Sequence, residues 1–393
     1  MGEKKSEIKM YQKYSIDLLA ESAYNVAIYC AGLHGVEFKR ILETCGINVN
    51  LFIDNDVEKN GKIIDNVPCL LPNNIGNKSI YKVIICVAIE NYNSVFETAL
   101  KQGFKNIIDF REILDDLIVN KERLFLELMR LRYKSKQADL FYTNDGRINN
   151  YNCGINITQN ERIAVYTGLF GGYDNFYEPL MISPNVDYFY ISDEQPKSLK
   201  IYSWIDAKTI IPSGISSPIK RNRYIKMHPH LIFHNYKFSL YLDSNIQIVG
   251  DVSKLFNESK CGISVFKHWK RDCLYYEAMT IVNNKRIVPE DAIRQIKRYM
   301  SEGFPIHYGL PELPVIARTH MNKMCIDIMN SWWHEFDNEC QRDQVSFPYA
   351  MWINKVNMTD LGILGNDVRS CNLLKFHEHI NDSKWIQNEK NLI

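Results

Sequence analysis

The sequence predicts an α/β protein built from two domains. Three observations support this. The chain has 393 residues, more than one average domain needs. Hydrophobic residues make up 46% of it, enough for complete cores. Strand-like and helix-like segments alternate from residue 24 to about 110, and a second such series starts at residue 162.

The first series predicts a parallel sheet. Short apolar runs separated by helices of about ten residues are typical of right-handed βαβ units. Gly46 and Gly103 follow two of the amphipathic stretches, as expected where helices end. The expected strands are 24–32, 48–56, 81–89 and 105–110, and the expected helices are 36–46 and 94–103.

The second series has longer and less regular connections. Its expected strands begin at residues 162, 186, 236 and 261, and helices are expected at 289–303 and 318–336. Residues 112–140 are helical in pattern and rich in charge, and 144–160 are rich in turn residues. We therefore predict an extension (1–23), a Rossmann-like domain (24–111), a helical linker (112–160) and a second α/β domain (161–393).

A glycine-rich turn follows the first strand. Gly32 and Gly35 precede a helix, whose free N–H groups suit an anion, and Asp54 ends the next strand, where a dinucleotide site keeps an acid for ribose. The spacing is G-x-x-G, however, and not the full G-x-G-x-x-G. The turn therefore predicts either a small-ligand site in the N-terminal domain or a domain that only packs.

The second domain carries an acid at the end of an apolar strand. The segment Phe238–Leu242 leads into Asp243, and Asn245 follows two residues later. In extended geometry these two side chains face the same side and can share one divalent ion. Such an ion neutralises a leaving diphosphate when a glycosidic bond breaks.

A basic segment lies just upstream. Lys220, Arg223 and Lys226 share one broad side of a predicted helix, with Arg221 beside them. Arginine binds phosphate in a bidentate manner, so the segment is predicted to hold the diphosphate; a solvated basic face is the alternative.

Two further groups complete the candidate site. His268, Arg271 and Glu277 lie in a polar, aromatic segment suited to sugar hydroxyls, with Glu277 as a catalytic carboxylate. Asp343 opens a late helix and is predicted to be the general base for the acceptor hydroxyl, because a carboxylate is ionised at neutral pH.

Seven segments, taken together, resemble a known family, the GT-A-like glycosyltransferase domains that include plant rhamnogalacturonan galacturonosyltransferases and uncharacterised bacterial proteins. In chain order these segments are VYTGLFGGYDNFYEP, VDYFYISDE, SPIKRNRYIKMHPHLIF, YLDSNIQIVGD, FKHWKRDCLYYEA, IARTH and RDQVSF. Upstream, IYCAGLHGVEFKRILE, LFIDNDVEKNGKIIDNVPCL and VIICVAI resemble the Rossmann-like domain of bacterial sugar-modifying proteins.

The resemblance implies a GT-A-type sheet in residues 161–393, a nucleotide-sugar donor and a glycan or lipid-linked glycan acceptor. It places Asp243 and Asn245 on the D-x-D-like position of a divalent metal site (Mn²⁺ or Mg²⁺), which His377 is expected to complete. Thr167, Gly171 and Tyr173 are expected to line the nucleotide pocket. The implied role is the synthesis of a bacterial surface polysaccharide such as capsule or lipopolysaccharide.

The net charge and the composition of the first residues limit the partners and the cellular location that we expect. The formal net charge is +1, which gives no global attraction to nucleic acid. The first residues are polar and lack the apolar core of a signal peptide, so a cytoplasmic protein is expected, with membrane association only through partners. Two alternatives stay open: a catalytically silent nucleotide-sugar- or glycan-binding protein, and a sugar-nucleotide oxidoreductase run by the N-terminal domain.

Overall fold

A computed structural model describes residues 16–20, 24–134, 140, 161–172 and 174–378. The chain divides into two compact units, residues 1–140 and 141–393, and each is described by itself. Both units are mixed α/β, which confirms the predicted fold class.

The N-terminal unit is a six-stranded sheet in the order β3-β4-β2-β1-β5-β6. All the pairs are parallel except the β3–β4 hairpin. Its strands are β1 (Asn25–Tyr29), β2 (Leu51–Ile53), β3 (Ile63–Ile64), β4 (Val67–Leu70), β5 (Tyr81–Ile85) and β6 (Ile107–Asp109), and its helices are α1 (Ile16–Leu19), α2 (Leu33–Thr44), α3 (Ile89–Lys101), α4 (Phe110–Asn120) and α5 (Glu122–Lys134).

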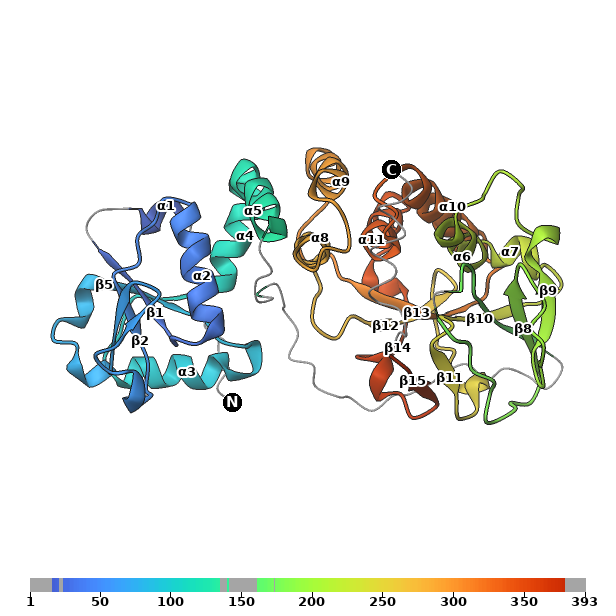
Figure 1. Cartoon of the computed structure of the whole chain (residues 1–393), viewed down its shortest axis with the longest axis horizontal. Coiled ribbons are helices and arrows are strands. Elements are labelled where there is room, and N and C mark those ends of the chain that lie inside the picture. The colour runs from blue at the N-terminus through green and yellow to red at the C-terminus, as the bar shows by residue number, and fades with distance from the viewer. Residues whose placement is uncertain (1–15, 21–23, 135–139, 141–160, 173, 379–393) are drawn as a thin grey trace, which may run out of the picture. The chain divides into compact units, whose positions relative to one another are not determined.

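Helices cover both faces of this sheet (Figure 1). Alternate residues of β1 point to opposite sides: Ala27 and Tyr29 join the core beneath α3, together with Ala99. On α2, Phe38 meets Phe110 of α4 edge to face. The sheet is therefore buried on both sides, which explains its continuous apolar strands.

Residues assigned to the extension and the linker pack into this unit. The apolar face of α4, including Ile113 and Leu117, is fully buried, and the main-chain N–H of Ile16 in α1 donates to Asp116. The region 112–134 is helical as expected, but it forms part of the first unit's core. The turn-rich segment predicted as the boundary, 144–160, lies outside the described residues.

The C-terminal unit is a seven-stranded sheet in the order β14-β12-β13-β10-β7-β8-β9, beside a two-stranded sheet, β11-β15. Its strands are β7 (Ile163–Gly168), β8 (Val186–Ser192), β9 (Ser203–Asp206), β10 (Phe238–Leu242), β11 (Ile246–Ile248), β12 (Ile263–Lys267), β13 (Pro311–Arg318), β14 (Gly362–Gly365) and β15 (Leu374–Phe376). Its helices are α6 (Pro218–Met227), α7 (Pro229–Ile232), α8 (Leu274–Asn283), α9 (Pro289–Glu302), α10 (Lys323–Asn338) and α11 (Asp343–Ile353).

Two cores pack against opposite faces of the large sheet. One contains side chains of α6, α10 and α11, among them Ile225, Trp332 and Phe347. The other lies against β11 and β15, which are below the sheet in Figure 1, opposite α10 and α11. Strand β13 is antiparallel to both its neighbours, and the other pairs of this sheet are parallel.

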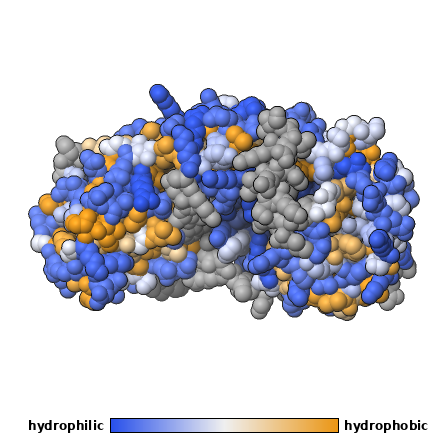
Figure 2. Space-filling view, in the orientation of Figure 1, coloured by the Kyte–Doolittle hydropathy of each residue, from blue (hydrophilic) through white to orange (hydrophobic). Residues whose placement is uncertain are grey.

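Short 3₁₀ turns connect these elements, at Val57–Lys59, Pro72–Asn74, Lys78–Ile80, Ala207–Thr209, Val252–Lys254, Met358–Asp360 and Val368–Ser370. Apolar residues on the face shown in Figure 2 lie in patches between hydrophilic ones. Within the described ranges, no helix combines the length and apolar character needed to span a bilayer.

Candidate functional site

Helix α6 brings the predicted basic residues to one place. Pro218 occupies the first turn, where its missing N–H costs nothing and its fixed φ favours a helix. Arg223 and Lys226, three residues apart, both contact the same oxygen of Asp343 at 2.8 Å. Lys220 points elsewhere and pairs with Asp337 of α10 at 2.6 Å. The cations of this helix face therefore form ion pairs with acidic side chains and are not merely solvated.

Lys226 connects the two predicted acids. It is 1% exposed, and its ammonium lies 3.5 Å from Asp243 as well as 2.8 Å from Asp343. The Tyr241 hydroxyl donates to Asp243 at 2.8 Å. Asp243 and Asp343, separated by a hundred residues of sequence, thus belong to one charged network with Arg223 and Lys226.

The network lies at the carboxyl edge of the parallel strands. Asp193 follows β8 and pairs with Arg221 at 2.5 Å. The amide of Asn222 donates to the carbonyl of Gly168, the last residue of β7, at 3.0 Å. Asp243 follows β10 directly. In open α/β sheets this edge is where ligands bind.

Charge neighbours fix the state of Asp343. Burial by itself would raise the pKa of its carboxyl, but the charges of Arg223 and Lys226 and the hydrogen bond from Lys226 hold that pKa well below its usual range. Asp343 is therefore ionised, as expected. In this state it is also a weak base, because basicity falls with pKa.

The loop after β7 lies against α6. Gly171 has a φ of +71°, and a Cβ there would meet Pro218 at 3.1 Å, so glycine permits the close approach. Thr167, also predicted to line the nucleotide pocket, lies within β7 and is 3% exposed. Tyr173 falls outside the described residues.

A second cluster follows β12. Arg271 donates to Glu277 at 2.7 Å, and Nε2 of His268 lies 3.7 Å from the same carboxylate. The main-chain N–H groups of Lys270 and Arg271 donate to Nδ1 of His268, so Nε2 is the protonated nitrogen and faces Glu277. Although burial raises the pKa of Glu277, the charges of Arg271 and His268 lower it below its usual value.

The start of β13 borders both clusters. The N–H of His268 donates to the carbonyl of Leu310 at 2.9 Å, and that of Asp243 donates to Pro314 at 2.8 Å. At the start of α11, Gln344 donates to Pro311. The network of Asp243 and Asp343 and the cluster of His268 therefore lie along one edge of the sheet.

Sequence reasoning missed a buried acid at the start of β13. Glu312 accepts a hydrogen bond from Arg369 at 2.9 Å, and burial raises its pKa to about 7. Its surroundings in the sequence, Pro311 and Pro314, do not suggest a strand. Asp193, the partner of Arg221, was missed as well, although an acid just after an apolar strand is a recognisable signal.

The predicted metal residues fit a divalent ion poorly. Asp243 faces Lys226 and Tyr241, whereas Asn245 is 1% exposed and its amide donates to the main-chain carbonyl of His377 at 2.8 Å. Asp243–Ile246 is a turn closed by a 3.0 Å hydrogen bond, so Asp243 and Asn245 do not share the side of an extended strand. Among the described residues, no group of three His, Cys, Asp or Glu side chains is placed to hold a metal.

The glycine turn of the N-terminal unit has a packing role. A Cβ on Gly35 would lie 2.1 Å from the carbonyl oxygen of Cys30, whereas one on Gly32 would meet nothing within 4 Å. Asp54 accepts hydrogen bonds from the Ala31 N–H and from Lys59, both at 2.8 Å. These contacts fasten the ends of β1 and β2 together, and a nucleotide ligand here stays a prediction.

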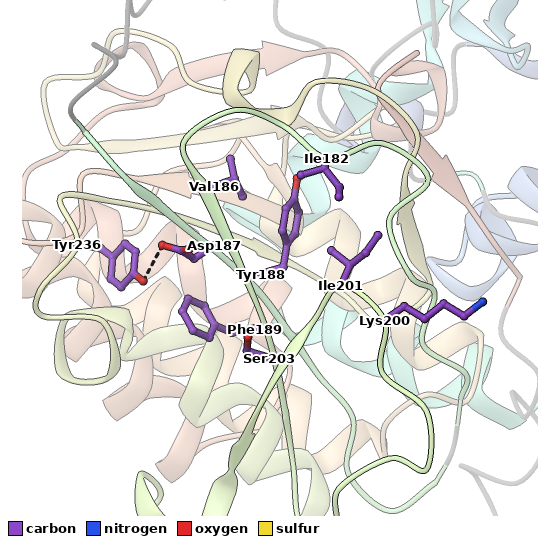
Figure 3. A pocket seen from close by; sticks show the side chains of 9 residues that line it. All are labelled: Ile182, Val186, Asp187, Tyr188, Phe189, Lys200, Ile201, Ser203 and Tyr236. Atoms are coloured by element: carbon purple, nitrogen blue, oxygen red, sulfur yellow. Dashed lines mark hydrogen bonds between the residues drawn. The ribbon is translucent and has the colours of Figure 1, made fainter.

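A cavity of about 520 Å³ lies in the C-terminal unit, away from the carboxyl edge of its sheet. It borders the amino-terminal parts of β8 and β9, and Figure 3 shows Tyr236 and Asp187 facing each other in its wall. The Tyr236 hydroxyl donates to Asp187 at 2.9 Å. None of the described residues predicted for the site lines this cavity.

Comparison with known proteins supports a glycosyltransferase-like assignment of the C-terminal unit. Residues 215–379 match the family model of the TOD1/MUCI70 glycosyltransferase-like domain, and this range contains α6, Asp243, the His268 cluster and Asp343. The match supports glycosyl transfer in general. No curated protein matches the chain.

Solved structures are similar only at a distance. Among them is the apo structure of the bifunctional glycosyltransferase WbbM, with 12% identity and a TM-score of 0.34. The similarity covers 53% of this chain and 40% of that one. A superposition this loose supports no inference about chemistry.

Proposed function

We propose that the C-terminal unit transfers a sugar from a nucleotide diphosphate sugar to a glycan acceptor. The observation that carries this proposal is the charged network at the carboxyl edge of the sheet. Arg221, Arg223 and Lys226 from one helix meet acids from three other segments there. The family match over the same residues supports it.

In this proposal the diphosphate replaces carboxylates as the partner of the cations. Arginine and lysine offset the charge that develops on the leaving diphosphate. A diphosphate that takes Arg223 and Lys226 away from Asp343 removes the cause of its low pKa. Asp343 then becomes a stronger base at the moment when the donor is in place, which suits removal of the acceptor hydroxyl proton.

The remaining expectations follow from the resemblance and stay proposals. They are a hexosyl or uronosyl donor, a glycan or lipid-linked glycan acceptor, and a role in surface polysaccharide synthesis at the inner face of the cell membrane. Divalent metal binding also stays a proposal, with Asp243 as its ligand, because Asn245 and His377 are held by other contacts.

A panel of nucleotide sugars tests the proposal, with binding and slow hydrolysis measured in EDTA and in Mn²⁺. Arg223→Gln is expected to weaken binding of the preferred donor roughly tenfold, or about 1.4 kcal/mol, because a phosphate contact is lost. Lys220→Gln is the matched control on the same helix and should leave binding unchanged, because Lys220 pairs with Asp337. If no donor binds in either condition, the proposal is wrong.

One observation favours a second candidate, a silent nucleotide-sugar-binding protein. Both predicted catalytic carboxylates, Asp343 and Glu277, are held by cations. A protein of this kind would bind a donor as tightly as the transferase. It would show neither hydrolysis nor transfer to any acceptor, so the same panel separates the two functions.

A further inference from the structure

Asn245 lies in the turn that joins β10 to β11. This turn begins with Asp243, so its conformation sets where the Asp243 carboxylate meets Lys226. Asn245 is 1% exposed, in contrast to Asp243, whose side chain is 28% exposed. The side chain of Asn245 is thus directed into the protein rather than towards the charged network.

Asn245 and His377 hold each other through two hydrogen bonds. The Asn245 amide donates to the His377 carbonyl at 2.8 Å, and the His377 N–H donates to the Asn245 carbonyl at 2.9 Å. The next pair along the ladder is Ile246 with Phe376 in the β11–β15 sheet. The two bonds therefore extend that sheet by one step and fasten the turn to the segment after β15.

The imidazole of His377 is oriented by contacts other than a metal. Its ring stacks on Tyr177 at 3.8 Å between centroids, with 5° between the ring planes. Gln247 donates its amide to the carbonyl of Glu178, which leaves its oxygen to accept from Nε2 of His377 at 3.1 Å. Nε2 consequently carries a proton and does not bind a metal, which leaves Nδ1 as the nitrogen with a lone pair.

We infer that Asn245 is a positioning residue, which fastens the Asp243 turn to the chain at His377, and that an aspartate cannot replace it because a carboxylate does not donate to the His377 carbonyl. The inference rests on the proposed function, since the turn matters through Asp243. A carboxylate at this position would put negative charge against the His377 carbonyl oxygen in a buried site.

The inference makes an unusual prediction about Asn245→Asp, the substitution that creates a D-x-D sequence. It should loosen the turn, with at least tenfold faster hydrogen exchange at residues 246–248 and 374–377 and at least fivefold weaker donor binding. Mn²⁺ affinity, measured by electron paramagnetic resonance on the full chain, should not increase. Asn235→Asp, the same change at an exposed position, should leave all three quantities unchanged.

A second variant covers the case in which Asn245→Asp fails to fold. His377→Phe keeps the stacking ring and both hydrogen bonds to Asn245 but removes the imidazole nitrogens. Slow exchange at residues 246–248 and unchanged Mn²⁺ affinity are expected. A loss of Mn²⁺ affinity in His377→Phe, or a gain of tenfold or more in Asn245→Asp, would make these residues metal ligands and overturn the inference.

Failure of the proposed function is recognised separately. If the unmodified chain binds no nucleotide sugar, the transferase proposal falls, whereas the exchange rates still decide whether Asn245 fastens the turn. If donors bind and Asn245→Asp exchanges and binds like the unmodified chain, only the positioning role is wrong.

Discussion

Two buried histidines, His228 and His320, destabilise the folded chain at low pH. Burial, together with the nearby positive charge of Arg318, lowers the pKa of each to about 4. Arg318 is itself buried and held by the Lys226 carbonyl at 2.6 Å and the Tyr166 hydroxyl at 2.7 Å. A protonated imidazole here would add a second unpaired charge to the same core.

Stability of the C-terminal unit should therefore fall on acidification. The unfolded chain takes up these protons near pH 6.5 and the folded chain only near pH 4. The contribution of these two histidines to stability is thus fully present above pH 6.5 and is lost as the pH falls from 6.5 to 4. The loss is about 2 kcal/mol per histidine between pH 7 and pH 5.

Urea unfolding followed by tryptophan fluorescence measures this effect, because all six tryptophans lie in the C-terminal unit. His320→Gln should reduce the loss between the two pH values, and His334→Gln, at an exposed position, should not. If the unmodified chain, His320→Gln and His334→Gln all lose the same stability between pH 7 and pH 5, the low pKa of His320 is not the cause of the loss.

Residue chemistry predicted part of the candidate site. Asp243 and Asp343 were recognisable because each follows a strand or opens a helix, and the spacing of Arg223 and Lys226 placed both on one side of α6. The role of Asn245 was not recognisable, because its partner is a main-chain carbonyl 132 residues away. A sequence pattern carries no information about such a bond.

At the scale of elements, β13 shows why some structure was missed. It contains Pro311 and Pro314, and proline in an apolar run argues against a central strand. In the structure, the pairing of β12 with β13 shifts between Val265 and Phe266, opposite the stretch that contains Pro314. An irregularity of this kind accommodates a residue without an N–H. The helix expected from Arg318 consequently begins only at Lys323.

The approach of α2 to β1 gives a prediction at the same scale. Gly35→Ala should destabilise the N-terminal unit by about 1–3 kcal/mol, because its Cβ would overlap the carbonyl of Cys30. Gly32→Ala, at the N-cap of α2, should cost less, about 0.5 kcal/mol, because alanine is a poorer N-cap but its Cβ meets nothing within 4 Å. Hydrogen exchange of β1 and β5 amides in the full chain measures both. Equal effects of the two substitutions would contradict the packing role of Gly35.

At the scale of the whole molecule, two units have separate cores. The core beneath α3 draws its residues from positions 27–107, and the two cores of the C-terminal unit from positions 163–376. Composition and alternating segments were enough to predict the α/β fold class. Where one unit ends depends on packing: α4 has a charged sequence, but its buried face packs into the first unit, where Phe110 contacts Phe38 of α2.

Separate cores should give separate unfolding transitions. Circular dichroism reports both units, whereas tryptophan fluorescence reports the C-terminal one. Gly35→Ala should shift a transition seen by circular dichroism and leave the fluorescence transition in place. A bound nucleotide sugar at 100 times its Kd should stabilise the fluorescence transition by about 2.7 kcal/mol, because the donor residues lie in that unit. If both probes instead follow one transition that moves with either change, the two units unfold as one, and the N-terminal unit contributes to the stability of the site.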